Sequence, residues 1–169
     1  VPSQSGSLTY NGGSQSPTWN NYNTAQLTIG GTTTGTNAGS YTATFTPKSN
    51  YRWSDGSTTP KSVNWSIGKA AGSLSISPAS MTLDTTTKSK TITVTRSGDG
   101  TISAVSNNTA AATVSVSGNT VTVTGKANGS ATITISVAAG TNYTAPANKT
   151  CAVTVSFLKD NFADNDWAS

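Results

Sequence analysis

The chain has 169 residues, of which 33% are hydrophobic and only 9% charged, with a formal net charge of +4. Low hydrophobicity with high charge is typical of disordered chains, but here charge is scarce too. Thr and Ser make up about a third of the residues, as expected for thin sheets that have one solvated face. This composition fits a single large core poorly and favours two small β domains.

The charged residues also limit the chemistry that we expect. The lysines are scattered along the chain instead of clustered among aromatic residues, so we expect no nucleic-acid partner. The chain has no His and no Glu, which rules out Ser-His-Asp and Cys-His catalysis by its own residues. Asp55, Asp84 and Asp99 lie in turn contexts, where aspartate usually caps its own backbone. We therefore predict no enzyme, no metal site and no cofactor.

Cys151 is the only cysteine. It shares the alternation of Val153, Val155 and Phe157, which predicts a buried side chain and not a reactive thiol. The chain contains no apolar run near membrane-spanning length, so we expect no membrane insertion.

Residues 1–70 predict a first β unit. Residues 1–6 are expected to be a flexible lead-in. In the segment 39–47, every second residue is apolar, which places Tyr41, Ala43 and Phe45 on an inner face. The other extended segments are expected at 8–10, 16–19, 27–29 and 63–67.

Residues 73–157 predict a second β unit. From Ala112 to Phe157 apolar residues alternate with Thr and Ser, which indicates half-buried antiparallel strands. On this phase Val114 and Val116 face inward, and residues 84–89 read as a polar hairpin connection. Residues 158–169 are acidic and are predicted to begin a further segment. The earlier strands are expected around 74–76, 81–83, 92–94 and 102–104.

These short strands are separated by Gly, Asn, Asp and Pro at regular spacing. No apolar spacing of three and four residues persists long enough for a helix of several turns. The predicted fold class is therefore all-β, with two tandem Ig-like antiparallel β-sandwiches.

The second unit resembles bacterial Ig-like domains of group 2. The resemblance is carried by Leu74-Ser75-Ile76-Ser77, by the Asn-rich run Ser106–Ser115, by Val121–Gly125 and by Gly129–Thr134. The tryptophan that many members place shortly before the Asn turn is absent. This resemblance implies a β-sandwich and transfers no catalytic residue.

The first unit resembles the Gly- and Tyr-rich Ig-like repeats of bacterial surface proteins. The matching residues are Tyr10-Asn11-Gly12, Gln15–Pro17, Ala38–Thr44 and Trp65–Ala70. Together the two resemblances imply a non-catalytic spacer or display module of a bacterial cell-surface or phage structural protein, such as a phage tail. They also imply an extracellular, cell-surface or virion location, with neighbouring domains of the same polypeptide as partners.

Four aromatic residues support an alternative function. Trp19, Tyr22, Tyr51 and Trp53 lie in the first unit among Asn and Ser. Exposed rings could stack on sugars, which predicts an adhesion module that binds carbohydrate or a host surface through these residues or through loop tips. The competing interpretation is that the rings fill the core of a small sandwich, and this is favoured for Trp19 and Trp53.

Overall fold

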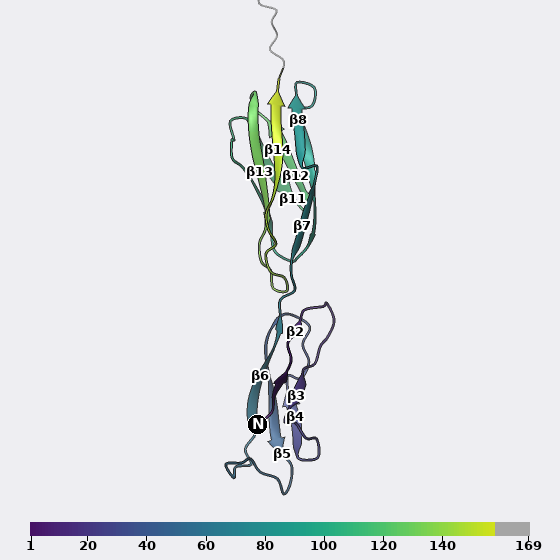
Figure 1. Cartoon of the computed structure of the whole chain (residues 1–169), viewed down its shortest axis with the longest axis vertical. Helices are drawn as coiled ribbons and strands as arrows, with labels where there is room; N and C mark the ends of the chain where they lie inside the picture. The colour runs from purple at the N-terminus through teal and green to yellow at the C-terminus, as the bar shows by residue number, and fades with distance from the viewer. Residues whose placement is uncertain (158–169) are drawn as a thin grey trace, which may run out of the picture. The chain divides into compact units, whose positions relative to one another are not determined.

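The computed structural model describes residues 1–157, and all regular elements in this range are β-strands (Figure 1). The all-β prediction is confirmed. Two compact units form. Unit 1 comprises residues 1–71 together with 140–144, and unit 2 comprises 72–139 and, of the described residues, 145–157. No helix in the described part of the chain is long and apolar enough to cross a membrane. The segment 158–169 lies outside the described residues, and so does its predicted role as the start of a further segment.

Unit 2 is a sandwich of two four-stranded sheets. The first sheet has the strand order β10 (Ile102–Ser106), β13 (Gly129–Val137), β14 (Lys149–Ser156) and β8 (Ser80–Asp84). The second has the order β11 (Ala112–Ser117), β12 (Thr120–Gly125), β9 (Ser89–Ser97) and β7 (Ser73–Ser77).

The core of unit 2 follows the alternation in the sequence. Along β13 and β14 the apolar residues of one face are buried, whereas Ala152 and the Thr and Ser between them are partly or fully exposed. Cys151 is fully buried, as predicted. Both sheets contribute to one cluster, whose fully buried members include Leu83, Ile92, Ala112, Val121, Val123, Ile133 and Ile135.

Two details of unit 2 differ from prediction. Val116 is 38% exposed, because it lies near the end of the edge strand β11, next to the turn into β12. Residues 84–89 do not close a hairpin, since β8 and β9 belong to different sheets and the connection crosses between them.

Unit 1 has a four-stranded sheet and a two-stranded ribbon. The sheet has the order β2 (Leu8–Thr9), β6 (Lys61–Gly68), β5 (Gly39–Pro47) and β4 (Leu27–Gly31). The ribbon pairs β1 (Ser3–Ser5) with β3 (Thr18–Asn20). The core contains Leu27, Ala43, Phe45, Trp53, Trp65 and Ile67.

The expectation of a flexible lead-in at residues 1–6 is wrong, because β1 forms there. Apart from pairing with β3, it is fixed by the amide side chain of Gln4. Gln4 Nε2 donates to the Ser66 carbonyl at 3.1 Å, and Gln4 Oε1 accepts from the Ser66 N–H at 2.9 Å. This side chain therefore pairs with the backbone of β6 much as another strand would.

The prediction of purely antiparallel sheets also needs correction. In unit 1, β2 runs parallel to β6, and in unit 2, β8 runs parallel to β14. In unit 2 the cause is a change of sheet: β7 pairs with β9, and after Pro78 the chain continues as β8 beside β14. Proline has no N–H to donate to a ladder, so β7 ends at this point.

Unit 1 is completed by a distant piece of sequence, residues 140–144. Within the unit, Asn142 Oδ1 accepts from the Ala38 N–H at 2.8 Å, and the Asn142 carbonyl accepts from the Ala70 N–H at 2.8 Å. The ring of Tyr143 meets that of Tyr10 edge-on, with 5.4 Å between centroids. In the sequence these residues fall within the range 73–157 of the predicted second unit.

Candidate functional site

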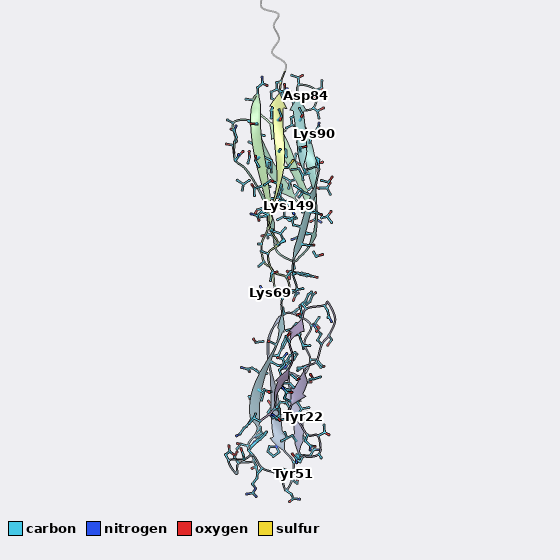
Figure 2. All side chains as sticks on the ribbon, in the orientation of Figure 1. Tyr22, Tyr51, Lys69, Asp84, Lys90 and Lys149 are labelled. Carbon is cyan, nitrogen blue, oxygen red and sulfur yellow. The ribbon has the colours of Figure 1, made fainter. Side chains whose placement is uncertain are left out.

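The predicted binding aromatics gather around the connections at one end of the unit 1 sheet. We call this region the unit-1 tip: residues 21–26, between β3 and β4, and residues 48–60, between β5 and β6. Figure 2 labels Tyr51 near this end of the unit and Tyr22 farther along the strands. Lys48 joins the two connections, because its Nζ donates to the Thr24 carbonyl at 2.6 Å and its N–H to the Gln26 carbonyl at 2.9 Å.

Trp53 anchors the longer connection from inside. Its side chain is only 8% exposed, and its Nε1 donates to the Thr59 carbonyl at 2.8 Å. Its backbone N–H donates to the Ser57 carbonyl at 2.9 Å. Lys61 Nζ lies 5.3 Å from the centroid of the indole ring, a cation–π contact. Trp53 is thus a core residue, as the core interpretation predicted, and its ring is not available to a ligand.

Asp55 holds the turn that follows Trp53. Its Oδ1 accepts from the backbone N–H and the hydroxyl of Ser57, at 2.9 and 2.6 Å, and its Oδ2 pairs with Lys61 Nζ at 2.7 Å. The Lys61 ammonium, followed by the Ser57 hydrogen bonds, holds the pKa of this carboxyl well below its usual range. The carboxylate is occupied in shaping the loop.

Trp19 and Tyr22 pack on Phe45. Both rings meet the Phe45 ring edge-to-face, with centroid separations of 4.9 and 5.2 Å. This is a favoured geometry for buried aromatic groups. Both side chains are half-buried, so their faces contribute mainly to the core.

Tyr51 is the predicted site residue that projects outward. It is 42% exposed, and within residues 1–157 it is the one aromatic among the exposed large apolar side chains. It sits in a tight turn in which its N–H donates to the Lys48 carbonyl at 3.0 Å and Asn50 has a φ of 70°. Asparagine tolerates this left-handed conformation better than most residues.

The sequence analysis missed Arg52 and Lys48 as members of this site. Both side chains are exposed, and Arg52 adjoins Tyr51 in the chain. The signal available in the sequence was that both cations lie in the run 48–53, beside Tyr51 and Trp53. The exposed groups of the unit-1 tip therefore include the phenol ring of Tyr51, the guanidinium of Arg52 and the ammonium of Lys48. Trp53 is buried and is not among the exposed candidate binding residues.

The remaining reactive side chains have structural surroundings. Asp84 Oδ1 accepts from the N–H groups of Thr86 and Thr87, at 2.9 and 2.6 Å, and from the Thr86 hydroxyl at 2.7 Å. Burial raises the pKa of the Cys151 thiol. Among residues 1–157, no group of three or more Cys and Asp side chains converges as metal ligands, and no pocket is present.

The fold is thus that of an all-β tandem module, and several solved structures are similar to it. Domains 4–9 of the surface layer protein SbsC share 23% identity, with a TM-score of 0.43 over 70% of this chain. This chain spans 18% of that longer structure. SbsC domains 4 and 5 share 22% identity, with a TM-score of 0.42, over 83% of this chain and 82% of that one. Fibronectin(III)-like modules of CbhA from Clostridium thermocellum share 11% identity, with a TM-score of 0.39, over 93% and 95% of the two chains.

No protein-family model matches the chain, and no curated protein matches it. The resemblance of unit 2 to group 2 bacterial Ig-like domains stays a prediction. The residues that carry it lie on β7 and along β10 to β13 with their turns.

Proposed function

We propose that this chain is a non-catalytic spacer and display segment of a bacterial cell-surface or phage structural protein, in which tandem β-sandwiches carry tension. Its location would be extracellular, at the cell surface or on the virion. Its partners would be neighbouring domains of the same polypeptide. The observation that carries the proposal is that the last strand of each unit pairs in parallel with the second strand of that unit, β6 with β2 and β14 with β8.

Parallel pairing decides how a pulling force reaches the hydrogen bonds. In unit 2 the N-terminal end of β8 and the C-terminal end of β14 lie at opposite ends of their ladder, which joins residues 80–84 to residues 152–156. Tension that reaches β8 through β7 and acts on β14 from its C-terminal end therefore slides these two strands along each other. All the hydrogen bonds of the ladder are then loaded together, whereas an antiparallel hairpin pulled at its open end loses them one at a time.

The packing around this ladder supports the same role. Met81, Leu83, Val153 and Val155 on these two strands are all buried in the core of unit 2. Sliding β8 past β14 must therefore also expose apolar surface, which costs about 25 cal/mol for each Å². After Lys149, the exposed residues of β14 are Thr150, Ala152, Thr154 and Ser156, so the strand presents no large apolar patch to solvent.

The test is single-molecule force spectroscopy on unit 2 with two pulling directions. In the first, force acts through the chain ends of the unit. In the second, it acts through cysteines placed at Ala127 and Ser156, two exposed positions beside the same end of the antiparallel β13–β14 pair. Cys151 is fully buried and stays out of the attachment chemistry.

We expect the end-to-end direction to need a several-fold higher unfolding force than the Ala127–Ser156 direction. Equal forces in the two directions would show that the β8–β14 ladder does not resist tension, and the proposal would fail. A second candidate function, adhesion through the aromatics of unit 1, is favoured by the exposure of Tyr51 and is developed below.

A further inference from the structure

The unit-1 tip exposes Tyr51 although the fold does not need its ring there. Trp53, two residues later, fills the core, and Trp53, Ser57, Thr59 and Asp55 together make the hydrogen bonds that hold the loop. Tyr51 contributes to the turn through its backbone N–H, which donates to the Lys48 carbonyl. A rigid loop that presents a phenol ring to solvent is a suitable platform for a ligand with an apolar face.

The charge beside this ring is unbalanced. The unit-1 tip with Lys61 contains three cations, Lys48, Arg52 and Lys61, and one carboxylate, that of Asp55, so its net charge is +2. The carboxylate is taken by Lys61. No ion pair joins the guanidinium of Arg52 to a carboxylate among residues 1–157. A ligand that complements this charge would be anionic.

We propose that the unit-1 tip binds an acidic polysaccharide. The ring of Tyr51 stacks on the apolar face of one sugar, and the guanidinium of Arg52 pairs with a sugar carboxylate. Arginine suits this role because its planar fork donates two parallel hydrogen bonds to a carboxylate. Lys48 adds a second positive charge, and Asn50 adds an amide next to the ring.

The shape of the site selects a polymer over a single sugar. No pocket is present among the described residues, so a monosaccharide would keep most of its surface in water. A chain of acidic sugars can lie across the open tip and rebind with neighbouring residues of the polymer. Affinity for each site would be weak, and display of many copies would raise it by avidity.

The binding test uses an oligomer of galacturonic acid as the acidic probe and the corresponding galactose oligomer as its neutral match. Titrations of the isotope-labelled chain followed by NMR report both the affinity and the amides that respond. We expect the galacturonate oligomer to shift signals of residues 48–57 and the galactose oligomer to bind at least about tenfold more weakly, since a charged hydrogen bond contributes roughly 1.5–3 kcal/mol.

Variants at the tip separate the two contacts. Tyr51→Ala and Arg52→Ala should each weaken galacturonate binding by about tenfold or more. Tyr51→Phe keeps the ring face and should bind like the original chain. Lys126→Ala removes the same charge from an exposed position of unit 2 and should leave binding unchanged. Both tip residues are exposed, so the fluorescence of Trp53 and Trp65 should show an intact fold in every variant.

Four results would overturn this proposal: no galacturonate binding, equal binding of the galactose oligomer, an undiminished affinity of Arg52→Ala, or an equal loss in Lys126→Ala. A single-stranded oligonucleotide that binds as tightly as galacturonate would also refute the carbohydrate assignment. The force response of unit 2 does not depend on Tyr51 or Arg52, so failure of this proposal leaves the mechanical role intact.

Discussion

Single residues show how strictly the alternation of the sequence determines burial. Val153 is 2% exposed in the middle of β14, whereas its neighbour Thr154 faces outward. We predict that Val153→Asp unfolds unit 2, because a buried and unpaired carboxylate costs several kcal/mol and small domains have only about 5–15 kcal/mol to lose. The amide NMR signals of β12 and β14 provide the measurement.

Thr154→Asp is the matched control for this substitution. It introduces the same charge one residue along the same strand but on the outer face, and it should leave those signals dispersed. If both variants were equally folded, the assignment of the inner face of β14 would be wrong.

Trp53 offers a second test at the level of residues. Trp53→Ala removes a buried indole together with its hydrogen bond to Thr59. We expect the free energy of unfolding of unit 1 to fall by about 3–5 kcal/mol. Chemical denaturation followed by the fluorescence of Trp65 and Trp19 measures this change. Tyr51→Ala in the same loop should change it by no more than about 0.5 kcal/mol, and a comparable loss there would contradict the anchoring role of Trp53.

Asp84 predicts a pH dependence. Hydrogen bonds from the Thr86 hydroxyl, and then from the N–H of Thr87, lower the pKa of its carboxyl below the ordinary value of 3.8. A carboxyl whose pKa is lowered by folding stabilises the fold above its unfolded pKa, and this contribution disappears as the pH falls through the lowered value. We therefore expect unit 2 to lose stability as the pH falls below about 4.

Asp84→Asn should weaken this dependence, since asparagine keeps an oxygen acceptor but does not titrate. Urea titrations of both proteins near neutral pH and at pH 3, followed by the NMR signals of unit 2, make the comparison. Asp55→Asn, the matched change in unit 1, should leave the unit 2 transition as it is. Identical acid sensitivity in Asp84→Asn and the unsubstituted chain would refute the role of this carboxylate.

At the level of elements, the sequence predicts which residues form strands and which face each strand buries. The segment 39–47 became β5, with Ala43 and Phe45 fully buried and Tyr41 stacked on Trp65 at 4.6 Å. The buried face can be predicted because successive side chains in a strand point alternately to the core and to solvent, so apolar and polar residue types alternate with a period of two. The inward position of Cys151 follows from the same rule.

Strand direction and partner choice could not be predicted in this way. The alternation of apolar and polar residues is the same whether a neighbouring strand runs parallel or antiparallel. The parallel direction of the β2–β6 and β8–β14 pairs therefore cannot be predicted from this pattern. The strand β1 was missed because Ser3-Gln4-Ser5 has no apolar residue and depends on the side chain of Gln4. The unit-1 tip was predicted only in part. Its aromatic residues could be identified from the sequence, but only their burial shows that Trp53 belongs to the core and that Tyr51 is exposed.

At the level of the whole molecule, the two units differ in the length of their parallel ladders. The parallel pair of unit 1 joins two residue pairs, Leu8 with Ile67 and Thr9 with Gly68, whereas that of unit 2 joins five. We predict that tension on the complete chain unfolds unit 1 at a lower force than unit 2.

The two events can be told apart by the chain that each releases. Residues 1–71 extend to about 250 Å and residues 72–157 to about 300 Å, at roughly 3.5 Å per residue. Force–extension traces of the complete chain supply both the order and the lengths. If the longer release came first, ladder length would not govern mechanical strength in this chain.

The membership of residues 140–144 in unit 1 bears on how the protein can be dissected. A fragment that ends at Ala71 omits the acceptors that Asn142 offers to Ala38 and Ala70, and it leaves the ring of Tyr10 without that of Tyr143. We expect such a fragment to melt below unit 1 of the complete chain, and a synthetic peptide that spans these five residues to recover part of the difference. A domain boundary placed after Ala71 would thus divide a folded unit. Transfer of the first sandwich to another protein would also require residues 140–144, which lie some seventy residues further along the chain.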